Sequence, residues 1–229
     1  LPPVSIDYGH SSLKLTLGQP VSLMPRLNGS VATNWSVEPG FPAGISLGPM
    51  GQISGSPEIV ATSEIYTIEA SNSGGSVQTS LILEVVDIPV WDLDYDELTF
   101  DLSIGDIISG ILPSWGGGVP TSWEISPPLP PGFFFSNSNG EIYGEAEEVQ
   151  EWTNHTVWAN NSGGGDSTEL SFRVISQPPG LLYWESSEVA LASNVSTSIT
   201  ALYSGPEVDT WAIDPDLPQG LQLSNGTIH

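Results

Sequence analysis

Apolar and polar residues alternate over several short stretches of this chain. Leu13, Leu15 and Leu17 are separated by polar residues, and the same period of two recurs over 81–85 and 98–104. A period of two places one face of a strand on a core and the other in water. No stretch shows the i, i+3, i+4, i+7 spacing of an amphipathic helix over three turns. The pattern therefore predicts an all-β protein of antiparallel β-sandwiches, with short strands joined by Gly, Pro, Asn and Ser turns.

The chain also repeats itself with a period of about 88 residues. Three residue types recur at this spacing, namely Tyr8, Tyr95 and Tyr183, then Trp35, Trp123 and Trp211, and then Gly44, Gly132 and Gly220. A fixed period of this kind indicates a tandem array of similar units. Pro-containing junctions at 88–90 and 177–179 divide the chain into a first copy (1–88), a second (89–177) and a partial third (178–229). We expect the three tryptophans to be core residues because their spacing follows the repeat.

The order of motifs within a copy points to one family. Tyr8 is followed by Ser-Ser-Leu-x-Leu-x-Leu-Gly at 11–18, Trp35, Gly-x-Ile-x-Gly-x-Pro at 51–57 and Ala-Ser-Asn-Ser-Gly-Gly at 70–75. This succession resembles the bacterial and archaeal putative immunoglobulin-like repeat family, which is related to dystroglycan-type cadherin-like domains. The resemblance extends over nearly the whole chain. It implies tandem immunoglobulin-like modules inside a large secreted or cell-surface protein, where such modules act as spacers, stalks or adhesive units.

The third copy is incomplete. Its last residues, 225–229, match the turn at 139–142 of the second copy, so the equivalents of the last strands are missing. A sandwich without these strands would expose its interior and unpaired strand edges. Either the chain is part of a longer array that supplies them, or another molecule donates a strand and subunits polymerise head to tail. A natural continuation beyond His229 that contains these strands would eliminate donation.

Charge narrows the set of partners. The chain has 27 acidic and 3 basic residues, a formal net charge of −24. Binding to nucleic acid or to anionic lipid is therefore not expected. The sequence has no cysteine, which excludes disulfides and thiolate zinc sites. No apolar run reaches the roughly 18–20 residues that cross a bilayer, so this segment is not expected to insert in a membrane. The start at Leu1-Pro2-Pro3 is expected of a processed chain or an excised piece.

The sequence lacks the motifs of an enzyme. Its histidines, His10, His155 and His229, lie in three different copies without metal-ligand spacing. There is no Gly-x-Ser-x-Gly elbow and no glycine-rich phosphate loop before a helix. We therefore predict that the chain has no catalytic activity.

Three aspartates at the junction of the first two copies suggest a metal site. Alternation along an extended strand would point Asp92, Asp94 and Asp96 to one side, where their charges repel unless a cation or solvent screens them. Calcium accepts six to eight oxygen ligands, so it could bind here and stiffen the junction. The aligned positions of the other copies do not carry three carboxylates. The alternative is a solvated acidic edge that discourages strand-to-strand aggregation.

Two further features concern the surface. Trp115 is expected in a glycine loop beside Gly116, Gly117 and Gly118. There it would either be exposed and contact a sugar or a protein, or fold back as a lid on its own sandwich. Six Asn-x-Ser/Thr sequons predict N-linked glycans on an exported chain, which an intact mass above that of the bare polypeptide would reveal. They are at Asn28, Asn34, Asn154, Asn160, Asn194 and Asn225.

Together with these features, the family resemblance implies an extracellular or cell-surface segment with a structural or adhesive role, as part of a stalk, filament or surface layer that can assemble end to end. Its expected partners are other copies of itself or neighbouring repeats. The alternative is a module of a large secreted protein that binds carbohydrate or another protein through Trp115 and nearby loops.

Overall fold

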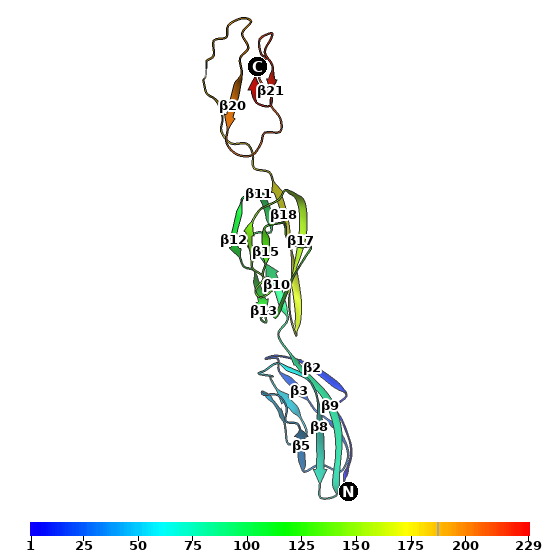
Figure 1. The fold of residues 1–229 in the computed structure, drawn as a ribbon. Coiled ribbons are helices and arrows are strands. Elements are labelled where there is room, and N and C mark those ends of the chain that lie inside the picture. Colours follow the sequence, from blue (N-terminus) through cyan, green and yellow to red (C-terminus); the bar gives the residue numbers. More distant parts are fainter. Residues whose placement is uncertain (187) are drawn as a thin grey trace.

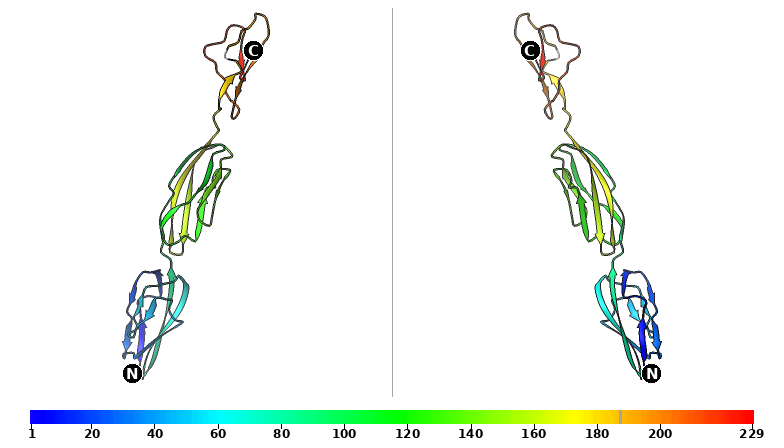
Figure 2. Two further views of the ribbon diagram at one scale, coloured as in Figure 1. Left: turned by 90° about the vertical axis from the view of Figure 1, so that its left-hand side faces the viewer. Right: turned by 90° about the vertical axis from the view of Figure 1, so that its right-hand side faces the viewer.

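The structure, a computed structural model, describes residues 1–186 and 188–229. All regular elements in these residues are β-strands, and they form three groups that lie in line, here called units one, two and three (Figure 1). The strands of unit one span residues 3–86, those of unit two 90–175 and those of unit three 182–228. The units also follow one another lengthwise in the two side views of Figure 2. In the described part of the chain, no helix has the length and hydropathy required to cross a membrane.

Unit one is a β-sandwich. A four-stranded sheet, β2–β9–β8–β5, faces a three-stranded sheet, β3–β7–β6, and β1 pairs with β4. The strands are β1 (Pro3–Asp7), β2 (Ser12–Thr16), β3 (Val21–Leu23), β4 (Arg26–Gly29), β5 (Asn34–Glu38), β6 (Ile45–Leu47), β7 (Ile53–Gly55), β8 (Ala61–Asn72) and β9 (Gly75–Val86).

Unit two repeats this arrangement strand for strand. Its sheets are β11–β18–β17–β14, β12–β16–β15 and the pair β10–β13. The strands are β10 (Val90–Asp94), β11 (Thr99–Ser103), β12 (Ile107–Ile111), β13 (Ser114–Gly117), β14 (Ser122–Ser126), β15 (Phe133–Phe135), β16 (Ile142–Glu145), β17 (Gln150–Asn161) and β18 (Gly164–Ile175).

The sheets of the two complete units are antiparallel except for one strand pair in each unit. The strands β2 and β9 run parallel, and so do β11 and β18. Antiparallel direction is imposed when a short hairpin joins two strands, as it does for β8–β9 and β17–β18. The parallel pairs join the second strand of a unit to its last strand, so no hairpin fixes their direction.

The core of each complete unit is covered by its long terminal hairpin. Alternate residues of β8–β9 and β17–β18 point inward and are almost completely buried. These are Ile68, Ala70, Leu81, Leu83 and Val85 in unit one, and Val157, Ala159, Leu170, Phe172 and Val174 in unit two. The alternation of apolar residues in the sequence thus corresponds to the alternate residues that face the core.

The repeated tyrosines and tryptophans form one structural motif in units one and two. The hydroxyl groups of Tyr8 and Tyr95 each donate a hydrogen bond of 2.5 Å, to the carbonyl oxygens of Gly51 and Gly140. Burial raises the pKa of Tyr8 to about 12 and also raises the pKa of Tyr95. Each glycine lies under the repeat's tryptophan ring, at a place where a Cβ atom would collide with the ring.

Unit three contains one four-stranded sheet, β19–β20–β22–β21. Its strands are β19 (Leu182–Trp184), β20 (Ile199–Tyr203), β21 (Leu223–Ser224) and β22 (Thr227–Ile228). Trp211 retains its glycine, Gly226, but Tyr183 is 56% exposed. The alignment of Tyr183 with the two buried tyrosines is therefore wrong. A shift of one residue turns a strand side chain to the opposite face, and here Trp184 points inward instead.

Candidate functional site

The linker between units one and two is held by hydrogen bonds to the β17–β18 turn of unit two and to the residue that follows β13. The Asn161 side-chain amide donates a hydrogen bond of 2.7 Å to the carbonyl oxygen of Ile88, and the Asp87 amide donates one of 2.9 Å to the Ser162 hydroxyl. The Gly118 amide donates a third, of 3.2 Å, also to Ile88. The linking residues are thus fixed to unit two rather than suspended between the units.

The same contact occurs where the chain enters unit one. The Asn72 side-chain amide donates to the carbonyl oxygen of Leu1 at 3.0 Å, as Asn161 does to Ile88. Each asparagine oxygen also accepts a backbone N–H of its own turn, from Gly74 at 2.8 Å and from Gly163 at 2.9 Å. The motif at 70–75 was noted from the sequence, but this role of the asparagines was not predicted. The signal was present, since the Asn-Ser-Gly-Gly segment occurs in both copies.

Glycine allows this close approach. A Cβ atom on Gly163 would overlap the carbonyl oxygen of Asp87, and one on Gly74 would lie 2.7 Å from the carbonyl carbon of Leu1. A side chain at either turn would push the entering segment away. The repeated turn is therefore both a hairpin connection and a surface that receives the preceding linker.

The three junction aspartates do not lie along one face of a regular strand. Pairing of β10 with β13 is irregular between Trp91 and Asp94, and Asp92 has a φ of 49°. Asp94 lies at the strand end, where its carboxylate accepts the Tyr95 amide at 2.9 Å, and Asp96 follows the strand. The expected alternation is thus wrong at Asp92, because an irregular strand resets the period of two.

Calcium binding at Asp92, Asp94 and Asp96 stays a prediction. In residues 1–186 and 188–229, no three His, Cys, Asp or Glu side chains gather as a metal site requires. If calcium binds, the melting temperature of unit two rises in millimolar calcium relative to chelator, because a ligand that prefers the native state stabilises it. At ten times the dissociation constant the gain is about 1.4 kcal/mol. An unchanged melting temperature would exclude the site.

The sequons lie on the surface. Five of the six asparagines are exposed, and Asn160 is half-buried. The Asn154 side chain donates to the Glu169 carboxylate at 2.8 Å and accepts from the Ser171 hydroxyl, and Asn28 donates to Ser5. Attachment of sugar at these positions stays a prediction.

Trp115 lies in strand β13 and not in a loop, and it is 39% exposed. Its ring packs edge-on against the buried Trp123 at a centroid distance of 5.5 Å, an arrangement like the expected lid. A more exposed aromatic pair was not predicted: Phe134 and Tyr143 stack at 5.6 Å on the outer face of β15–β16. Recognition of a sugar or protein by Trp115 stays a prediction.

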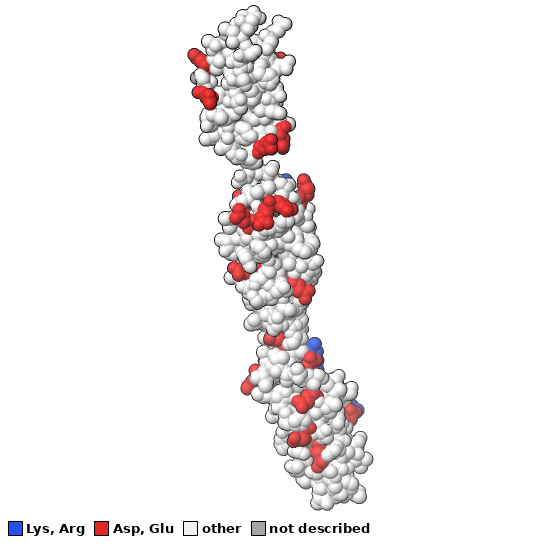
Figure 3. All heavy atoms as spheres, in the orientation of Figure 1, with Lys and Arg blue, Asp and Glu red and all other residues white. Residues whose placement is uncertain are grey.

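Acidic groups occur on all three units in the view of Figure 3, with several gathered on the upper part of unit two. In unit two, Arg173 forms a bidentate ion pair with Asp101, which lowers the pKa of that carboxyl. The Arg173 guanidinium also lies 5.0 Å from the centre of the Trp152 ring. The face in Figure 3 therefore presents mainly negative charge to a partner.

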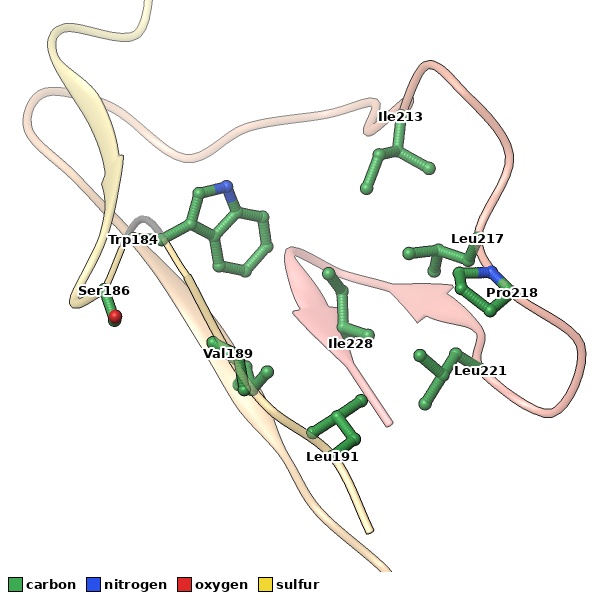
Figure 4. A pocket seen from close by; sticks show the side chains of 10 residues that line it. Trp184, Ser186, Val189, Leu191, Ile213, Leu217, Pro218, Leu221 and Ile228 are labelled. Carbon is green, nitrogen blue, oxygen red and sulfur yellow. The ribbon is translucent and has the colours of Figure 1, made fainter. Parts of the chain in front are cut away.

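Unit three contains an open apolar cavity of about 280 Å³. Figure 4 shows Trp184, Val189 and Leu191 on one side, facing Ile213, Leu217 and Leu221 on the other, with Ile228 between them. Several of these side chains are substantially exposed, for example Val189 at 49% and Leu191 at 45%. The cavity is lined almost entirely by residues that a sandwich would bury.

His155 packs in the core of unit two. His155 is completely buried in unit two, where its Nδ1 lies 2.9 Å from the carbonyl oxygen of Pro127 and its ring packs edge-on against Phe172 at 5.5 Å. It occupies the inward hairpin position that Tyr66 holds in unit one. The environment is that of a core side chain.

A comparison with protein families identifies the fold of unit one. Residues 3–86 match the sequence model of a family described as "Putative Ig domain". Unit two has the same strand order, and the two units follow one another in one chain. The chain is a tandem of Ig-like β-units. No curated protein sequence matches it.

Solved structures of tandem Ig domains are similar to this chain at low identity. Extracellular domains 3–5 of Drosophila OTK match at 14% identity with a TM-score of 0.43, covering 74% of this chain and 61% of that one. Titin domains A168–A170 match at 17% identity and 0.43, covering 86% and 73%. Insect hemolin matches at 16% and 0.42, covering 76% and 47%. The chain spans less than two thirds of the OTK and hemolin structures, and similarity at this level carries no functional argument.

Proposed function

We propose that this chain is a structural repeat segment of an extracellular or cell-surface protein, in which Ig-like units set the length and the junctions set the stiffness. The observation that supports it best is the recurring asparagine contact, by which the hairpin turn of each complete unit holds the segment that enters it. In a linear array each unit contacts mainly its neighbours, so the mechanical properties depend on these junctions. We place the unit boundaries at 88/89 and 177/178.

The finer parts of the proposal concern surroundings and partners. The segment belongs to a stalk, filament or surface layer, carries glycans on its exposed sequons and meets other copies of itself or neighbouring repeats. Its strong negative charge keeps parallel chains apart unless cations screen them. The role is mechanical and requires no catalysis.

Replacing Asn161 by Ala tests the junction. The variant loses the hydrogen bond to Ile88 and those that the Asn161 oxygen accepts from Gly163 and Gly164. We expect a wider distribution of angles between units one and two in small-angle X-ray scattering and residual dipolar couplings, with unit two destabilised by about 1–2 kcal/mol.

Asn72→Ala is the matched control, because Asn72 makes the same kind of contacts at the entry to unit one, away from the junction between units one and two. It should destabilise unit one by a similar amount and leave the angles between units one and two unchanged. If Asn161→Ala and Asn72→Ala give the same scattering as the wild type, the asparagine contact does not stiffen the junction.

A further inference from the structure

Two exposed aromatic side chains distinguish unit two from unit one. Phe134 and Tyr143 are 58% and 43% exposed, and their rings stack at a centroid distance of 5.6 Å. They are paired across β15 and β16, and the residues paired at the same register position of β6 and β7 are Ser46 and Ser54. Because unit one forms the same pair of strands with serines, the fold does not require aromatic rings at these positions.

Two carboxylates lie on the same outer face. Side chains alternate along β16, and Ile142 is completely buried, so Glu141, Tyr143 and Glu145 point to the opposite side. The Glu141 carboxylate lies over β12, because a Cβ atom on Gly110 would be 2.7 Å from its Oε1. Glu145 is exposed. The aromatic pair is thus flanked by a carboxylate on either side along the strand.

The whole group of outward residues is specific to unit two. Two aromatic and two acidic residues occupy the four positions in unit two, and four small or amide side chains occupy them in unit one. These are Phe134, Glu141, Tyr143 and Glu145 in unit two, and Ser46, Gln52, Ser54 and Ser56 in unit one. Two copies of one sandwich therefore differ here in surface chemistry and not in backbone.

The chemistry of this face suits an organic cation. Glu141 and Glu145 are four residues apart, about 13 Å along an extended strand, so a single metal ion cannot bind both. An aromatic ring attracts a cation over its face, and a carboxylate accepts two parallel hydrogen bonds from a guanidinium. Arginine makes both kinds of contact with one planar group.

Unit two already contains one arginine held in this way. The Arg173 guanidinium lies 5.0 Å from the centre of the Trp152 ring and forms a bidentate ion pair with Asp101. The other two basic residues of the chain, Lys14 and Arg26, belong to strands of unit one. The aromatic and acidic groups on β15–β16 thus offer the same combination to an arginine from outside unit two.

We propose that the outer face of β15–β16 binds an extended, arginine-bearing segment of a partner protein. Its guanidinium groups would lie against the rings of Phe134 and Tyr143 and pair with Glu141 and Glu145. Arginines at alternate positions of an extended segment match the spacing of the outward residues of β16. The net charge of −24 attracts a basic segment and repels a second copy of this chain. This binding role goes beyond the proposed structural role and does not depend on it.

The experiment uses the full chain and three probes. They are an eight-residue peptide that alternates serine and arginine, the same peptide with glutamate in place of arginine, and the neutral sugar chitohexaose. Calorimetric titration measures affinity, and NMR amide shifts locate the site. We expect the arginine peptide to bind with shifts centred on 133–135 and 141–145, and salt to weaken it. The glutamate peptide should not bind.

Variants that carry the residues of unit one separate the contributions. Phe134→Ser with Tyr143→Ser removes the rings, and Glu141→Gln with Glu145→Ser removes the carboxylates. Each double variant should weaken binding of the arginine peptide about five- to tenfold. The melting temperature of unit two should change by only a few degrees, since unit one folds with these residues.

A charge-matched control removes two carboxylates from the opposite sheet. Glu124 and Glu169 are exposed on the outer face of β14–β17–β18, and changing both to Gln should alter the affinity less than twofold. If this control weakens binding as much as the site variants do, the peptide is attracted by the acidic chain as a whole and the proposal is overturned. Failure of the arginine peptide to bind would also overturn it.

Two further results would assign the face to another occupant and overturn the proposal. One is binding of chitohexaose at 133–135 and 141–145, which would make it a carbohydrate site. The other is self-association of the chain that Phe134→Ser with Tyr143→Ser abolishes, which would make a second copy the occupant. Scattering from units one and two reports on junction stiffness independently, so failure of this proposal and failure of the proposed function are distinguishable.

Discussion

Replacing Gly132 by Ala should destabilise unit two by about 3 kcal/mol or more. Gly132 has a φ of 92°, which an L-residue adopts at a cost, and its Cβ would overlap the carbonyl oxygen of Glu145 and approach the Glu147 side chain. The backbone on either side is held by hydrogen bonds, from Glu145 to Gly132 at 3.1 Å and from Glu147 to Pro131 at 3.2 Å, so it cannot move away without losing them.

Differential scanning calorimetry of the whole chain measures this effect. The transition of unit two should fall by roughly 12–24 °C, while that of unit one stays in place. Gly220→Ala is the internal control, since Gly220 has the same conformation without the covering backbone. Equal shifts for Gly132→Ala and Gly220→Ala would mean that backbone conformation alone, and not close packing, makes glycine necessary at this position.

The fold could be predicted from the sequence because the repeat and the alternation both follow from which residues face the core. Leu81, Leu83 and Val85 alternate in the sequence since alternate residues of β9 face the core, and Trp123 is buried 88 residues after the half-buried Trp35. Because the pattern occurs in more than one copy, a feature that recurs at the same position can be told from one that occurs by chance. The incomplete third copy was evident for the same reason.

The features that were not predicted depend on single residues that change the register of a strand or contact residues far away in the sequence. An irregular pairing at Asp92 resets the alternation of β10, and a shift of one residue exposes Tyr183. The contact of Asn161 with Ile88 joins residues 73 positions apart, and no local pattern reports such a pair. Trp115 was assigned to a loop because of its glycines, although these allow the Trp91 ring to lie against β13.

Phe172→Ala should have the largest effect among core substitutions, about 3–5 kcal/mol. Phe172 is completely buried in β18 and stacks on Phe100 at 4.4 Å, while Phe133 and His155 lie against it at 5.9 and 5.5 Å. These rings come from both sheets, so truncation leaves a cavity that neither sheet can close by itself.

The Phe172→Ala variant also shows whether the units unfold independently. If the units fold independently, calorimetry shows the transition of unit two lowered by about 10 °C or more and that of unit one unchanged. Leu83→Ala, at the equivalent position of β9, should do the reverse, and Ile175→Ala, at an exposed position of β18, should shift neither by more than a few degrees. If the two transitions move together instead, the units are coupled through the hydrogen bonds that Asn161, Ser162 and Gly118 form with the linker. In that case units one and two would respond to load as one rigid body.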